Sequence, residues 1–304
     1  EFNLNVPVTM SKIRTESYRE YAWPGPLAAA FNRNGIGTAV VLVAFIAIAM
    51  FLGVRALGSD LTKAVPSGDF YAAIPHAVMA GTFGWVGLFV LIAMLIGLAR
   101  FWRHAGEPIA NAGNPAALGQ ALRDVFTLKY LHRAGAGCAV SDTKRSVARR
   151  HAHHLTFYGF LLCFAATVLG TIYHYAFGWV APYAWTSGPK LLGTTGGVLL
   201  VAGTAWLWRL RRTRHPEHVE PAQAPMDLGF IALLFLVAAS GLALALARAA
   251  QALPLLLCLH LGAVLAFSFT MPYGKFVHGV YRVAALLKWA VERRLPNKLQ
   301  LGPE

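Results

Sequence analysis

The residues of this sequence best suited to chemistry are histidines that stand at the ends of two apolar runs. The first run, residues 149–175, carries three near its start and one near its end, namely His151, His153, His154 and His174. The second run carries one near each end, His260 and His278. A polar imidazole is costly in lipid, whereas neutral imidazole is the commonest metal ligand among side chains. The placement therefore suggests that these side chains bind a metal ion or a metal-containing cofactor.

Helical geometry decides which of these histidines face the same way. Successive residues of an α-helix turn by about 100° and rise by about 1.5 Å. His260 and His278 are 18 residues apart, so on one continuous helix they point the same way, about 27 Å apart. His153 lies about 60° from alignment with His174, and His154 lies about 160° from it. We favour His153 as a ligand and keep His154 as the alternative.

Composition shows what kind of element positions these side chains. Hydrophobic residues make up 57% of the 304 and charged residues only 13%, against about a quarter charged in a soluble domain. A helix needs about 20 apolar residues to cross a membrane, and six segments are long enough. They are 36–57, 75–99, 154–176, 190–208, 227–249 and 254–272. We expect an all-α integral membrane protein, built as a bundle of six transmembrane helices.

The distribution of positive charge predicts how the bundle is oriented. The net charge of +14 comes from Lys and Arg before the first span, between the second and third, after the fourth and after the sixth. Cationic loops mark the cytoplasmic side, so we expect both termini in the cytoplasm and the bundle in a bacterial inner membrane. We divide the chain into a cytoplasmic segment 1–34, a membrane domain 35–289 with a cytoplasmic loop at 100–150, and a cytoplasmic tail 290–304.

The cytoplasmic loop contains one further helix signal. In the stretch that begins NPAALGQALRDVF, Asn114 is a typical helix cap and Pro115 suits the first helical position. Apolar residues then form one stripe, made of Leu118, Leu122, Val125 and Phe126. Asp124 is expected on the opposite, polar face. We predict an amphipathic helix that lies in the membrane interface, with a docking surface for a soluble partner as the alternative.

The orientation places the histidines in two pairs at two depths, because the third and sixth spans run in opposite directions. At the cytoplasmic end His153 or His154 is level with His278, and at the outer end His174 is level with His260. A zinc site needs three or four protein ligands, often carboxylates, and neither span contains Asp or Glu. A porphyrin supplies four nitrogens itself and needs only axial ligands. We therefore expect a cytochrome b type bundle with two b haems, or with one in the alternative.

Charged residues near these pairs have expected supporting roles. Lys275 and Arg282 stand near His278 and are candidates to pair with haem propionates. Asp227, at the start of the fifth span, is expected to cap its helix. Two other kinds of protein compete with this interpretation: a cation transporter lined by histidine, and a membrane ferric reductase. Iron held as b-type haem would exclude the transporter.

Several long motifs of the chain are distinctive: RRHAHHLTFYGFLLCFAAT, MDLGFIALLFLVAASGLAL and LHLGAVLAFSFTMPYGKFVHGVYR. They resemble the tricarballylate-utilisation protein B family, also called the CitB-type cytochrome-like membrane proteins, and the similarity covers essentially the whole chain. The 18-residue spacing of His260 and His278 is also distantly similar to the γ subunit of respiratory nitrate reductase, a di-haem cytochrome b.

The resemblance implies an electron-transfer subunit of an oxidoreductase complex. In the family, a flavoprotein dehydrogenase, such as one that oxidises tricarballylate, passes electrons through iron–sulfur clusters and haem to the quinone pool. A related fusion protein acts in cobalamin biosynthesis, which is the alternative function. The cysteines of this chain are scattered: Cys138, Cys163 and Cys258. Iron–sulfur clusters are therefore expected only in a ferredoxin-like part ahead of residue 1 or in a partner.

A quinone acceptor needs a site of its own, and the sequence offers candidates at both faces. At the cytoplasmic face they are Lys275, Tyr281 and Arg282. At the outer face the candidate is His76, which opens the second span. Apart from protonation of the quinol, such a subunit needs no acid–base catalyst of its own.

Overall fold

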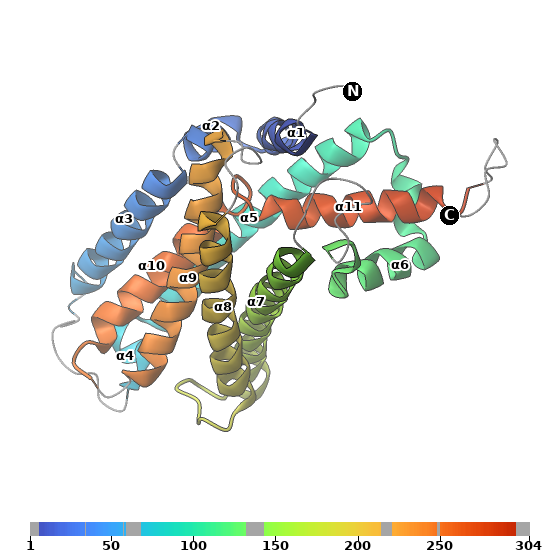
Figure 1. Cartoon of the computed structure of the whole chain (residues 1–304). Coiled ribbons are helices and arrows are strands. Elements are labelled where there is room, and N and C mark those ends of the chain that lie inside the picture. Colours follow the sequence, from blue (N-terminus) through green and yellow to red (C-terminus); the bar gives the residue numbers. More distant parts are fainter. Residues whose placement is uncertain are drawn as a thin grey trace.

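Helices make up all the regular structure in the described part of the chain. The computed structural model describes residues 6–33, 35–56, 58, 68–131, 143–213, 221–247 and 250–295. Within these ranges six helices are long and apolar enough to cross a membrane (Figure 1). They are α3 (Gly35–Ala56), α5 (His76–His104), α7 (Thr143–Phe177), α8 (Gly188–Arg212), α9 (Ala224–Leu246) and α10 (Leu253–Thr270). The prediction of an all-α integral membrane protein with six spans is confirmed.

Shorter helices lie at the two ends of this bundle (Figure 1). One end carries α4 (Phe70–Ala73), and we call it the α4 end. The other, which we call the α11 end, carries α1 (Val6–Tyr21), α2 (Gly25–Arg33), α6 (Pro115–Phe126) and α11 (Val277–Glu292). Three short 3₁₀ helices complete the described structure: η2 (Ile109–Gly113), η3 (Lys129–Leu131) and η5 (Pro221–Gln223). The positive charge of its loops predicts that the α11 end is cytoplasmic.

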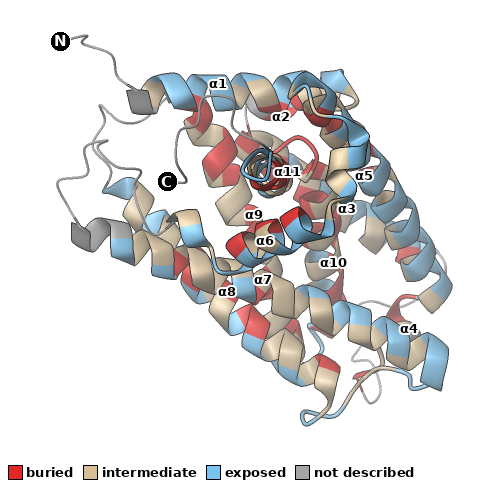
Figure 2. Cartoon of the chain, turned by 90° about the vertical axis from the view of Figure 1, so that its right-hand side faces the viewer, coloured by how far each residue is buried: buried red, intermediate tan, exposed pale blue. Residues whose placement is uncertain are grey.

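The outward faces of the long helices are apolar. Phe45 on α3, Trp85 on α5 and Phe164 on α7 are each at least 60% exposed. Figure 2 shows exposed residues along the outer side of α5. A water-soluble protein rarely exposes so large an apolar surface, whereas a surface that faces lipid tails requires one.

Helices α7 and α8 form a hairpin whose backbones are in contact. A Cβ atom added at Gly159 of α7 would lie 2.6 Å from the amide nitrogen of Leu200, and one added at Gly203 of α8 would lie 2.6 Å from that of Thr156. Only glycine permits this approach, which is typical of membrane helix pairs. Helix α8 in turn packs on α9. The face of α7 that carries His153 is thus positioned through α8.

The chain breaks between α10 and α11, which corrects one expectation. Helix α10 ends at Thr270, whose carbonyl accepts hydrogen bonds from the amides of Tyr273 at 3.1 Å and Gly274 at 2.9 Å. Residues 271–276 form a turn that contains Pro272, which lacks an amide hydrogen and disfavours a continuing helix. The assumption of one continuous helix through His260 and His278 is wrong. His278 lies on α11, which leaves the direction of α10 (Figure 1).

Helix α6 begins at the predicted residues, but the face that packs against the protein is not the one made of its large apolar residues. The side chain of Asn114 accepts a hydrogen bond from the amide of Ala117 at 3.0 Å, and Pro115 is the first helical residue. Ala117 and Ala121 pack against α11, while the stripe of larger apolar residues stays partly exposed: Leu118, Leu122 and Phe126. Asp124, expected on the outer polar face, is buried, and Lys129 compensates its charge at 3.3 Å. The position of this stripe in the membrane interface stays a prediction.

Candidate functional site

At the α11 end, two of the predicted histidines face each other. The rings of His153 on α7 and His278 on α11 have centroids 6.2 Å apart and planes at 81°. Metal–imidazole bonds are about 2 Å long, so two imidazoles on opposite sides of one metal ion have centroids about 6 Å apart. An edge-to-face ring contact also falls in this range. The separation therefore fits a shared metal ion as well as a direct ring contact.

The nitrogen atoms of this pair are arranged as metal ligands require. His278 Nδ1 donates to the backbone carbonyl of Lys275, an assignment that leaves Nε2 with its lone pair free. Burial lowers the pKa of His278 to about 4, so its imidazole stays neutral at physiological pH. His153 Nδ1 is buried without a hydrogen-bond partner among the described residues. A buried imidazole nitrogen without a partner is costly, and a bound cofactor would remove that cost.

The structure separates the two alternatives at the start of α7. His153 points to His278, whereas the ring contact of His154 is with Tyr158, at 5.9 Å. His151 is exposed. Their different surroundings follow from the turn of about 100° between successive helical residues. His154 Nε2 is also buried without a partner among the described residues, so it is the ring contact with His278 that favours His153 over His154.

Three aromatic side chains pack together near the histidine pair in the sequence. Phe160, two turns into α7 from His153, contacts Phe267 on α10 at 5.9 Å and Phe276 at 5.5 Å between ring centroids. Phe267 and Phe276 also contact each other, at 5.9 Å. The three rings form one apolar cluster, and because Phe276 stands two residues before His278, a flat apolar ligand at the pair would have an apolar neighbour of this kind.

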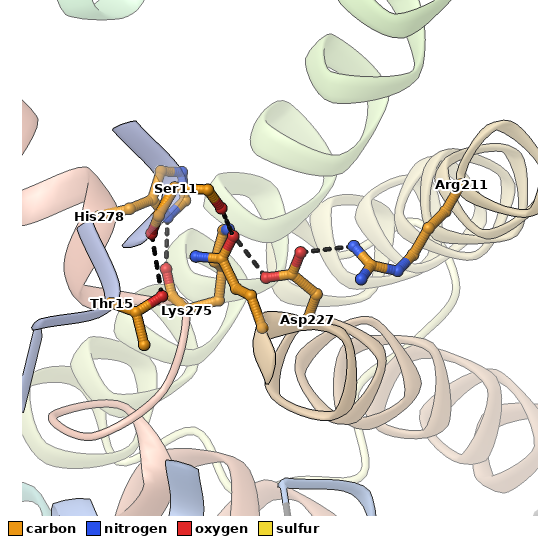
Figure 3. A network of polar contacts seen from close by, with 7 residues as sticks. Ser11, Thr15, Arg211, Asp227, Lys275 and His278 are labelled. Atoms are coloured by element: carbon orange, nitrogen blue, oxygen red, sulfur yellow. Dashed lines mark hydrogen bonds and ion pairs between the residues drawn. The ribbon is translucent and has the colours of Figure 1, made fainter. Parts of the chain in front are cut away.

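A buried carboxylate lies beside the pair, in a role that the sequence did not predict. Asp227 is within the first turn of α9, whose cap residue is Gln223, so the expectation that Asp227 caps the helix is wrong. Its carboxylate lies between two cations: Lys275 Nζ at 2.8 Å from Oδ1, and Arg211, which donates to Oδ2. Figure 3 shows Asp227 between these partners. The ion pairs join α8, α9 and the turn before α11.

Positive charge exceeds negative charge around this carboxylate. Burial lowers the pKa of Lys275, Asp227 opposes that shift, and both Arg14 and Arg211 lie near enough to lower the pKa further. Arg282 acts in the same way on His278. Four cations thus share the site with the carboxylate of Asp227. The site therefore has an excess of three positive charges, and two anionic groups on a bound cofactor would offset two of them.

Tyr281, a predicted quinone contact, is packed among other aromatic rings. Its ring centroid lies 5.2 Å from that of Phe101, 5.7 Å from that of Tyr21 and 6.1 Å from that of Tyr18. Burial raises its pKa to about 12. Of the other two candidates at this end, Lys275 is held by Asp227, while Arg282 is exposed.

At the α4 end, the structure gives the predicted residues different neighbours. His174 on α7 is stacked on His76, with ring centroids 4.1 Å apart and planes at 15°. Tyr71 contacts both rings edge-on, at 5.0 Å from His76 and 6.0 Å from His174. A spacing of 4.1 Å is too short for a metal ion between the two rings, which needs about 6 Å. His174 Nδ1 is buried without a partner among the described residues.

His260, the predicted partner of His174, faces α9. Its Nδ1 lies 3.1 Å from the hydroxyl of Ser240, and a Cβ added at Gly241 would lie 2.9 Å from Cε1 of its ring. Among the described ring contacts none joins His174 to His260. The neighbour of His174 that sequence reasoning missed is His76, and the available signal was that both stand at the same end of their spans.

Comparisons with known proteins agree on one family. The sequence model of the family described as citrate utilization protein B matches residues 33–298. A curated protein of Escherichia coli, citrate utilization protein B, is 42% identical over 295 residues, which are 97% of this chain and 77% of the E. coli protein. No solved structure matches the chain.

Proposed function

The chain belongs to the citrate utilization protein B family, and on that premise we propose that it is a haem-binding membrane subunit that carries electrons from a dehydrogenase to quinone. The family name points to growth on citrate or on a related tricarboxylate such as tricarballylate. The observation that carries the proposal is the facing pair His153 and His278, 6.2 Å apart between ring centroids. Two opposed imidazoles could hold the iron of a b-type haem.

The residues of the chain fit such a group in three respects. His153 and His278 would be the axial ligands, and the carbonyl of Lys275 fixes the tautomer that presents Nε2 of His278. Lys275 and Arg282 remain the candidates for the propionates, and the structure adds Arg14 and Arg211. The cluster of Phe160, Phe267 and Phe276 would give the ring of the haem an apolar neighbour. When bound, a haem supplies one-electron chemistry through its iron.

A second haem at the α4 end rests on fewer observations. His174 and His260 stay the predicted ligands, but His174 is stacked on His76 and no described ring contact joins it to His260, so the two rings must be brought together before they can share a metal ion. The hydrogen bond to Ser240 suits His260 to ligation: the Ser240 hydroxyl donates to the carbonyl of Leu236, so its oxygen accepts from His260 Nδ1 and leaves Nε2 with its lone pair. The expected stoichiometry is thus one haem at His153 and His278, and two if the α4 end rearranges.

The electron donor and acceptor are proposed from the family and from charge. A flavoprotein dehydrogenase, with iron–sulfur clusters in a ferredoxin-like part or partner, would dock at the α11 end, whose loops are cationic. Of the quinone candidates, Lys275, Tyr281 and His76 are each engaged by neighbouring side chains, which favours the exposed Arg282.

Haem content tests the proposal directly. The protein purified in detergent from cells that make haem is expected to give a pyridine haemochrome of the b type, with one or two haems per chain. His278→Ala is expected to lose one haem per chain. His151→Ala, which removes an exposed histidine of the same cluster, is the matched control and should keep full content. A wild-type protein without haem, or a His278→Ala protein with unchanged haem, would refute the assignment.

A further inference from the structure

Asp227 is a buried carboxylate that ligates no cofactor in the proposed function. It is 8% exposed and pairs with Lys275 and Arg211. Burying a carboxylate is expensive unless its charge is compensated, and removing one partner from such a group is strongly destabilising. A helix start does not require this arrangement, since an exposed Asp would serve α9 equally well. The burial of Asp227 near the histidine pair therefore indicates a role beyond starting the helix.

Lys275 links this carboxylate to the imidazole of His278. At one end of Lys275, Nζ lies 2.8 Å from Asp227 Oδ1. At its other end, the backbone carbonyl accepts the hydrogen bond from His278 Nδ1. Both contacts are visible in Figure 3. Asp227 therefore fixes the residue whose carbonyl fixes the ring of His278.

From this geometry we propose that Asp227 is a positioning residue, which holds His278 toward His153 through Lys275 and lowers the reduction potential of the cofactor bound there. The proposal rests on the proposed function for its second half only. Among the described residues, the carboxylate that acts on Lys275 is that of Asp227, whereas Arg14, Arg211 and Lys275 are all cationic. Without its negative charge, the uncompensated cations favour the reduced form of a nearby metal.

Three variants separate positioning from a merely structural role. Asp227→Asn keeps the shape and removes the charge, and Asp227→Glu restores the charge. Glu107→Gln is the matched control: its carboxylate lies 2.7 Å from Lys288 on the same helix as His278, but ten residues farther along, about 15 Å. Glu107→Gln therefore removes a carboxylate that pairs with α11 but leaves the turn at 271–276 unchanged.

The first measurement uses protein purified from cells that cannot make haem. Diethyl pyrocarbonate modifies free imidazole nitrogens, and peptide mass spectrometry reads the rate at His278, with His260 as the internal reference. We expect the rate at His278 to rise several-fold in Asp227→Asn, to return toward wild type in Asp227→Glu, and to be unchanged in Glu107→Gln. Lys275→Gln breaks the same link from the other side and is expected to raise the rate as well.

The second measurement is a redox titration of the haem-loaded proteins, followed by absorbance. In Asp227→Asn we expect the equilibrium constant for reduction of one haem to rise tenfold. This corresponds to a reduction potential more positive by about 59 mV for one electron. Asp227→Glu and Glu107→Gln should stay near wild type. Equal modification rates at His278 in wild type and Asp227→Asn would overturn the proposal. Absence of haem from wild type would instead refute the proposed function, while the first measurement would still decide the positioning role.

Discussion

Replacing Gly159 by alanine tests whether α7 and α8 touch through their backbones. The added Cβ would lie 2.6 Å from the amide nitrogen of Leu200 and 2.9 Å from the carbonyl oxygen of Gly196. Backbone atoms cannot turn aside as a flexible side chain does, so the helices must separate. Overpacking of this kind costs about 1–3 kcal/mol, whereas alanine in place of glycine within a helix gains about 1 kcal/mol. The net effect is a loss of about 0–2 kcal/mol.

Gly193→Ala supplies the matched control on the same helix pair. There the added Cβ would lie 3.5 Å from the Cβ of Ala166, which is an ordinary contact. Only the gain in helix propensity applies, so this variant is expected to be more stable than wild type by about 1 kcal/mol. Thermal unfolding in one detergent, followed by tryptophan fluorescence, should place Gly159→Ala a few degrees below Gly193→Ala. The close approach would be refuted if Gly159→Ala melted at the same temperature as Gly193→Ala or above it.

Three other features give predictions of their own. Hydrogen bonding from Lys288 lowers the pKa of Glu107 in the folded protein. The ionised carboxylate therefore stabilises the fold above the pKa that Glu107 has in the unfolded chain, and this stability is lost as the pH falls through the lower pKa of the folded protein. Glu107→Gln should therefore flatten the decline in melting temperature below about pH 4.3, and an unchanged decline would contradict the pairing. His76→Ala should expose His174 to diethyl pyrocarbonate and raise its modification rate several-fold; an unchanged rate would show that the stack does not cover it. A nitroxide attached at Leu122→Cys should collide more often with oxygen than with a water-soluble nickel complex, and the reverse order would place α6 in water.

Local signals in the sequence were sufficient for the helices. The six spans follow from the length and apolar character of single segments, and the start of α6 follows from Asn114 and Pro115 side by side. Such signals act within a few residues and need no knowledge of neighbours. Pro272 and Gly274 also signalled the turn after α10. A continuous helix was nevertheless favoured because His260 and His278 are 18 residues apart, which is five whole helical turns.

The features that sequence reasoning missed depend on which helices are neighbours. Asp227 pairs with Arg211, 16 residues before it, and with Lys275, on the far side of α10, so no local pattern joins the three. The stack of His76 on His174 requires that α5 and α7 meet at the α4 end, which hydropathy does not encode. The preference for His153 over His154 was available from helical angles alone, because it depends on one helix.

The turn at 271–276 makes the two histidines of the last apolar run mechanically independent. His260 moves with the membrane-spanning α10, but His278 moves with α11, which packs on α6 and meets α1 through Tyr281 and Tyr18. A small tilt of α11 would act as a lever on the His278 ring and leave His260 at rest. A partner protein that binds the helices of the α11 end would therefore have a direct mechanical route to one imidazole, without any rearrangement among the six long apolar helices.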